Sequence, residues 1–220
     1  MDREMVFNLV SAVMNLAVIV LTVIAMADFT RPQGGSANMK VKRFKCLKYF
    51  TVQSNLIAAL TALFMLYFNV ESLVTGHAAV PYWMSVFKFT GATAVMLTFI
   101  VVMTLLAPAV GLKLLLEGGS LYMHLITPLV AALTFIVFEC TNTLDWYSLL
   151  FAMIPVVCYA ILYFVMVVIV KEDRGGWKDF YGFNKGGKWY FSCVIVIGMA
   201  VGLAILIRFG HNAMTSAVGY

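Results

Sequence analysis

The side chains best suited to chemistry lie in two short polar groups that interrupt apolar stretches of the chain. Thr51 and Asn55 are four residues apart, so on a helix they share one face. His124 is followed four residues later by Pro128. Because proline has no N–H and its ring clashes with the carbonyl four residues earlier, the helix is expected to kink at His124. A hydroxyl and an imidazole on two such helices can act as a nucleophile and its base.

The chemistry that these groups predict is acyl transfer. His124 can accept the proton of the Thr51 hydroxyl as the oxygen attacks an acyl carbon. Asn55, Ser54 or Tyr122 could donate hydrogen bonds to the oxyanion that develops. The candidate site therefore has Thr51 and His124 as its catalytic pair and the other three residues as substrate- and oxyanion-binding groups.

The same residues also have a purely structural explanation. A threonine hydroxyl often bonds the backbone carbonyl three or four residues back, and a buried histidine can join two neighbouring helices. No carboxylate is evident in the pattern to orient His124, since Glu139 and Asp145 lie at the opposite ends of the apolar stretches. From spacing alone, both explanations stay open.

The composition of the chain requires a membrane around these residues. Of the 220 residues, 63% are hydrophobic and 11% are charged, whereas soluble domains carry about 25% charged residues. Six apolar stretches reach the roughly 20 residues that cross a bilayer. We therefore predict a single all-α domain over 1–220, an integral membrane bundle of six transmembrane helices. The predicted spans are 5–27, 49–70, 83–108, 120–139, 147–170 and 190–208.

Lysine and arginine predict how the bundle is oriented. Twelve of the fifteen lie in the first, third and fifth loops, and the others are Arg3, Lys88 and Arg208. Because positively charged loops stay cytoplasmic, we expect a multi-pass protein of the cell membrane with these three loops inside and both termini outside. Thr51 and His124 then lie near the cytoplasmic ends of their helices, at depths that differ by a few ångströms. Lys88 is expected to extend its ammonium to the interface.

Two further features bear on the organisation of the bundle. The fifth loop, 171–189, is basic and rich in aromatic residues. Such a loop either lies on lipid headgroups or covers a site that opens inward. Gly198 and Gly202 form a G-x-x-x-G pattern, for which we expect packing within the bundle, with a homodimer as the alternative.

The two polar groups resemble the signature of a known family. The pieces Tyr49-Phe50-Thr51…Ser54-Asn55 and His124…Pro128 are similar to those of the androgen-induced and androgen-dependent TFPI-regulating membrane proteins and their bacterial six-span relatives. The resemblance implies an intramembrane threonine hydrolase of fatty acid esters of hydroxy fatty acids, with Thr51 as nucleophile and His124 as its partner. Pro155, Tyr159 and the 179–183 stretch also look like bacterial members.

Three functions follow from these patterns. The first is an intramembrane hydrolase of acyl esters that takes its lipid substrate from the bilayer. The second is a transporter or channel for a small or lipophilic solute, and the third is a lipid-binding membrane protein without catalysis. We expect no nucleic-acid partner, no cofactor and no metal. His77 and His211 fall outside the predicted spans, and phosphate-, zinc- and redox-binding motifs are absent from the sequence.

Overall fold

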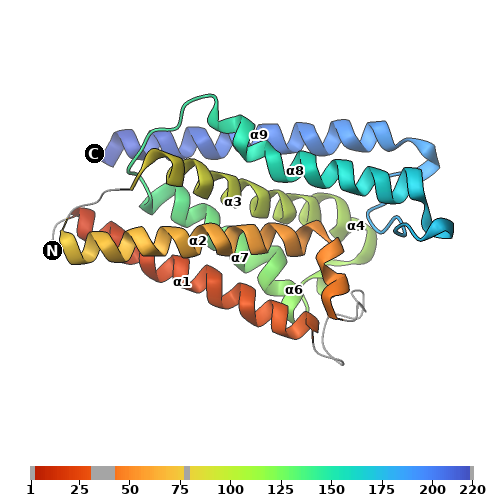
Figure 1. The fold of residues 1–220 in the computed structure, drawn as a ribbon, viewed down its shortest axis with the longest axis horizontal. Coiled ribbons are helices and arrows are strands. Elements are labelled where there is room, and N and C mark those ends of the chain that lie inside the picture. Colours follow the sequence, from red (N-terminus) through yellow and green to blue (C-terminus); the bar gives the residue numbers. More distant parts are fainter. Residues whose placement is uncertain (1–2, 31–42, 77–79, 219–220) are drawn as a thin grey trace.

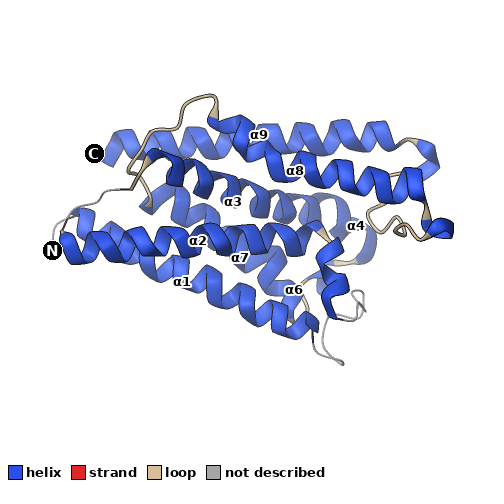
Figure 2. Ribbon diagram, viewed as in Figure 1, coloured by secondary structure: helices blue, strands red, loops and turns tan. Residues whose placement is uncertain are grey.

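The computed structural model of the chain describes residues 3–30, 43–76 and 80–218. Within these residues the chain is 85% helical, and Figure 2 shows helices joined by loops, with no strand. Six helices are long and apolar enough to cross a membrane, so the predicted all-α bundle of six helices is confirmed. They are α1 (Arg3–Thr30), α2 (Phe50–Thr75), α3 (Tyr82–Val101) with η2 (Val102–Leu106), the fourth span (Gly119–Phe138), α8 (Ser148–Phe164) with η5 (Val165–Val170), and α9 (Trp189–Val218).

The helices run along the long axis of the molecule, so the bundle has two distinct ends (Figure 1). α1 begins and α9 ends at one of them, which we call the terminal end. The opposite end carries residues 43–49, 111–118 and 171–188, and we call it the basic end because most lysines and arginines lie there. Large apolar side chains are exposed along the sides of the helices, among them Leu63, Leu150 and Leu206. Such sides are suited to lipid, which carries no polar partner for a helix backbone.

The fourth span has the irregularity that its proline predicts. It consists of α6 (Gly119–Leu121), the π-helical turns η3 (Tyr122–Ile126) and η4 (Thr134–Phe138), and α7 (Thr127–Leu133) between them. Since Pro128 cannot donate to the carbonyl of His124, the preceding turn widens, and the Thr127 N–H bonds the Tyr122 carbonyl instead. His124 therefore lies on a π-helical turn, a feature common at functional sites.

The sixth span is longer than predicted. The sequence indicated an end at Arg208, yet α9 continues to Val218. The arginine is tolerated there because its Nε donates to the Asp145 carbonyl at 2.9 Å and its guanidinium lies 4.1 Å from the Trp146 ring centroid. His211 is thus a buried residue of α9, and the prediction that it falls outside the spans is wrong. His77 lies outside the described residues.

Close helix packing centres on α3, which contacts α2, α7, α8 and α9. Small residues permit this approach: a Cβ on Gly91 would collide with Thr61 Oγ1 and lie 3.3 Å from Ala58 Cα. Gly198 and Gly202, by contrast, are exposed and have open space where a Cβ would stand. The expectation that they pack within the bundle is wrong, because they lie on the outer face of α9. A homodimer through Gly198 and Gly202 stays a prediction.

Because the two environments differ, we expect a glycine-to-alanine change to alter the free energy of unfolding by different amounts at Gly91 and at Gly202. Gly91→Ala is expected to lower the free energy of unfolding by about 1–3 kcal/mol, because the added methyl overpacks the α2–α3 contact. Gly202→Ala is the matched control, with an expected effect within about 0.5 kcal/mol. Denaturant titration of the purified variants in mixed micelles checks this, and equal unfolding curves for Gly91→Ala and the wild type would contradict it.

Candidate functional site

An apolar cavity of about 310 Å³ lies toward the basic end of the bundle. Its walls come from the start of α2, from α3 and η2, from α8 and α9, and from the fifth loop. Most lining side chains are apolar, such as Leu97, Val101 and Val196. Thr51, the predicted nucleophile, also lines the cavity and is 4% exposed. A buried hydroxyl therefore lies in the wall of an otherwise apolar cavity.

Thr51 is the second residue of α2, and two distant tyrosines hold the helix start that carries it. The residue before the helix, Tyr49, makes no side-chain capping bond. Instead, the Phe50 N–H donates to Tyr181 Oη at 3.1 Å, and Tyr159 Oη donates to the Lys48 carbonyl at 2.8 Å. Since the first N–H groups of a helix lack partners within the helix, Tyr181 serves as a remote cap for α2.

Asn55 connects the Thr51 helix to the His124 helix. Its Nδ2 donates to the Thr51 carbonyl at 2.7 Å and to the Met123 carbonyl at 3.1 Å. The two spans therefore meet at the level of the predicted site. Ser54 Oγ donates to the Thr51 carbonyl at 3.1 Å and shares a 2.8 Å hydrogen bond with the Thr98 hydroxyl. Neither Asn55 nor Ser54 lines the cavity, and both donate to the backbone.

His124 is buried, and one of its ring nitrogens is already occupied. Its Nδ1 lies 2.6 Å from the Leu115 carbonyl of α5 (Leu112–Leu115). A carbonyl can only accept, so Nδ1 carries the hydrogen and Nε2 is the basic nitrogen of the neutral ring. His124 does not line the cavity. Tyr122 does not line it either; it packs against the cluster of Ala25, Phe29, Cys46, Val52 and Met123.

The fifth loop folds back over the cavity, and sequence analysis left this open. Tyr181, Gly182 and Phe183 line the cavity. The loop turns sharply at Gly176, where a Cβ would collide with the Met166 carbonyl and lie 2.6 Å from that of Lys171. The alternation of basic and aromatic residues indicates an interfacial loop, but only the tertiary contacts show that aromatic residues of the loop line a cavity.

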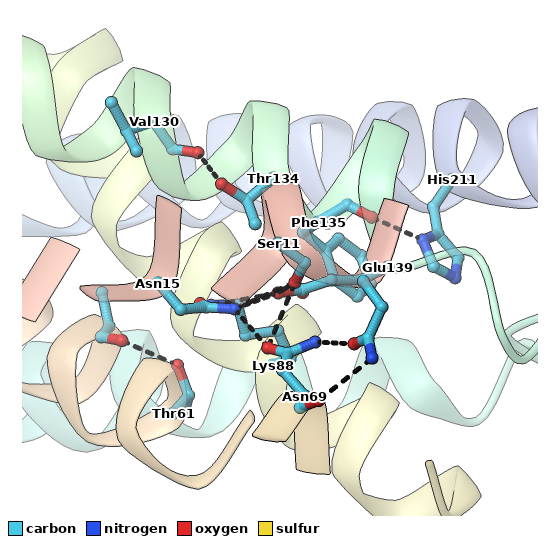
Figure 3. Close-up of polar contacts among 12 residues, drawn as sticks. Ser11, Asn15, Thr61, Asn69, Lys88, Val130, Thr134, Phe135, Glu139 and His211 are labelled. Carbon is cyan, nitrogen blue, oxygen red and sulfur yellow. Dashed lines mark hydrogen bonds and ion pairs between the residues drawn. The ribbon is translucent and has the colours of Figure 1, made fainter. Parts of the chain in front are cut away.

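A second polar site, which sequence analysis missed, lies toward the terminal end of the bundle. Figure 3 shows Ser11, Asn15, Asn69, Lys88 and Glu139 converging between the helices. Lys88 Nζ donates to Asn15 Oδ1 and lies 3.6 Å from Glu139 Oε1, and the two ionic side chains are 1% and 2% exposed. Glu139 Oε1 also accepts from Asn15 Nδ2 at 2.7 Å and from Ser11 Oγ at 3.1 Å.

This network corrects the prediction for Lys88 and gives Glu139 its partners. Lys88 does not extend its ammonium to the interface, because Asn15 and Glu139 satisfy it inside the bundle. Glu139 lies far from the His124 end, as expected, directly after the last helical residue of the fourth span, and its side chain is buried. Among the residues that the structure describes, none forms a hydrogen bond with its Oε2. The signal available in the sequence was the spacing of Ser11 and Asn15, four apart on one face of an apolar helix.

Comparison of the chain with protein-family models finds no match, and neither does comparison with curated proteins or with solved structures. The fold defines the class of protein: a multi-pass, all-α membrane protein. Among the described residues, no group of three or more histidine, cysteine, aspartate or glutamate side chains is placed to hold a metal ion.

Proposed function

We propose that the protein is an intramembrane hydrolase of acyl esters, with Thr51 as the nucleophile and His124 as the base. The observation that supports this most is the position of Thr51, a buried hydroxyl in the wall of an otherwise apolar cavity. Such a cavity suits an acyl chain, and the hydroxyl stands where the ester at the end of that chain would lie. The resemblance to the threonine hydrolases points to the same residue.

The substrate is a lipid that enters sideways from the bilayer. Three residues of the cavity wall, Leu105 on η2 and Ile195 and Ile197 on α9, are also exposed on the sides of the bundle. A chain in the membrane thus meets the cavity between η2 and α9 without crossing water. We also infer that the basic end faces the cytoplasm, because nine of the twelve lysines and arginines among the described residues lie at that end.

The chemistry runs in two steps. Thr51 Oγ1 attacks the ester carbonyl carbon while His124 Nε2 takes its proton, which then passes to the departing alcohol oxygen. Water, deprotonated by His124 Nε2, then attacks the acyl carbon of the acyl-threonine, and the proton passes from Nε2 to Thr51 Oγ1 as the fatty acid is released. The bond from Nδ1 to the Leu115 carbonyl suits this role, because it leaves Nε2 free to accept a proton. Catalytic contacts are often long in a ligand-free enzyme, and the π-helical turn that carries His124 is the element expected to shift when substrate binds.

Replacement of the base tests this proposal. His124→Gln is expected to slow the release of fatty acid from an acyl ester by about 10²–10⁴-fold, the usual contribution of a general base. His211→Gln is the matched control, since His211 is also buried but bonds the Phe135 and Asn142 carbonyls in the other half of the bundle. The assay uses purified protein in lipid nanodiscs. Equal rates for His124→Gln and the wild type would contradict the proposal.

A second candidate is a lipid-binding protein without turnover. It is favoured by the position of His124, which is outside the cavity wall and bonded to Leu115. Lipid that co-purifies with the protein distinguishes the two candidates. An intact ester that remains bound during prolonged incubation indicates binding alone, whereas its conversion to free acid indicates hydrolysis.

A further inference from the structure

The oxyanion donors predicted from sequence are engaged elsewhere. The amide of Asn55 donates to two backbone carbonyls, and the Ser54 hydroxyl bonds the Thr51 carbonyl and Thr98. Neither side chain lines the cavity, and Tyr122 does not line it either. A hydrolase with Thr51 as nucleophile still needs a donor that faces the ester carbonyl, because charge develops on its oxygen in the transition state.

Tyr181 of the fifth loop meets this need. We propose that the Tyr181 hydroxyl donates a hydrogen bond to the carbonyl oxygen of the bound acyl ester, and that the fold of the fifth loop serves to hold it there. Tyr181 lines the cavity together with Thr51, and its oxygen accepts the N–H of Phe50, the residue before Thr51 in the chain. This inference rests on the proposed hydrolase function and assigns it a further substrate-contacting residue.

A network of hydrogen bonds to the Asp179 carboxylate fixes the backbone around Tyr181. Asp179 Oδ1 accepts from the Tyr163 hydroxyl at 3.0 Å and from the Phe183 N–H at 2.8 Å, and Oδ2 accepts from the Asn184 N–H at 2.8 Å. The Tyr181 N–H in turn donates to Tyr163 Oη at 3.2 Å. Residues on both sides of Tyr181 are thus tied to Asp179 and to α8, which gives the phenol the preorganisation that a transition-state donor requires.

The chemistry of the phenol also fits the role of a donor. Burial raises the pKa of Tyr181 to about 12, against the opposing effect of hydrogen bonds with Tyr159, Phe50 and Thr51. The hydroxyl therefore keeps its proton near neutral pH. Its oxygen accepts a hydrogen bond from the positively polarised start of α2, and such a bond strengthens the donation of its own proton. The ester carbonyl oxygen would accept the hydrogen bond that this hydroxyl donates.

The test compares Tyr181→Phe with the wild type in ester hydrolysis and in binding. We expect kcat to fall about 10²–10³-fold, the usual effect of losing one oxyanion donor. Binding of a non-hydrolysable ether analogue, which has no carbonyl oxygen, should change less than about threefold. Tyr190→Phe is the matched control, because Tyr190 is exposed on α9, and it should keep the wild-type rate. The melting temperature of each variant is measured in the same nanodiscs.

Each other outcome overturns the inference in a distinguishable way. If Tyr181→Phe retains a rate within threefold of the wild type while Thr51→Ala is inactive, the hydrolase stands and the role of Tyr181 is wrong. If Tyr181→Phe is inactive, binds the analogue more weakly and also has a lower melting temperature, Tyr181 is only the structural cap of α2. If Thr51→Ala hydrolyses as fast as the wild type, the hydrolase proposal fails and the role of Tyr181 fails with it.

Discussion

Purified Thr51→Ala is expected to release fatty acid from an acyl ester at least about 10³-fold more slowly than the wild type, as nucleophile removal does in hydrolases. The reason is that the Thr51 hydroxyl oxygen forms the bond to the acyl carbon in the proposed mechanism, and alanine has no such oxygen. The alanine removes only the hydroxyl and a methyl at the start of α2, while Asn55 and Ser54 still bond the carbonyl of residue 51. The measurement is the initial rate of fatty acid release from a fluorogenic ester in nanodiscs.

Two variants make this result specific to the nucleophile. Thr98→Ala removes another buried hydroxyl from the same cavity, one that bonds Ser54 at 2.8 Å, and it should stay within about tenfold of the wild-type rate. Thr51→Ser keeps a hydroxyl at the same place and should retain measurable turnover. A Thr51→Ala protein as active as Thr98→Ala would show that the cavity hydrolyses esters by another group, or not at all.

The second large effect is expected at the Lys88–Glu139 pair. Lys88→Met and Glu139→Leu should each lower the free energy of unfolding by about 3–5 kcal/mol, because each leaves a buried charge without its partner. The double variant Lys88→Met/Glu139→Leu should recover most of that loss, since an apolar pair of similar size has no desolvation cost. Denaturant titration in mixed micelles measures the three values and their coupling.

An exposed ion pair provides the control for this experiment. Arg174 Nε lies 3.9 Å from Asp173 Oδ2 in the fifth loop, and both side chains are more than two-thirds exposed. Arg174→Met should therefore change the free energy of unfolding by less than about 1 kcal/mol. The double variant at Lys88 and Glu139 could instead lose as much free energy of unfolding as the two single variants added together. The two charges would then not be coupled, and the inference that they stabilise each other would be wrong.

The spans were predicted well because long apolar runs have few alternatives, and the errors concern charged side chains that were expected at the membrane interface or beyond it. Arg208 lies inside α9, since the Asp145 carbonyl and the Trp146 ring satisfy it. Lys88 lies inside the bundle, since Asn15 and Glu139 satisfy it. In both cases the partner comes from a distant segment, so no local pattern could reveal it.

The candidate site was predictable in part. Equal depth on two helices placed Thr51 near the fourth span, and the Asn55–Met123 contact shows that these helices meet there. The direction of the His124 side chain was not predictable, because the sequence pattern does not specify how the helix is rotated about its axis. In the structure the imidazole bonds the Leu115 carbonyl. Tyr181 was equally hidden, since it reaches α2 across 131 residues of sequence through the fold of the fifth loop.

The central claim is that Thr51 forms a covalent acyl intermediate, and an acylating or fluorophosphonate probe tests it most directly. The protein is incubated with the probe in nanodiscs, digested, and mapped by mass spectrometry. The account predicts one adduct, on the peptide that contains Thr51, which Thr51→Ala lacks and Thr98→Ala retains. Wild-type protein that stays unmodified, or that carries its adduct elsewhere in the cavity, such as on Ser192 or Cys193, would contradict it.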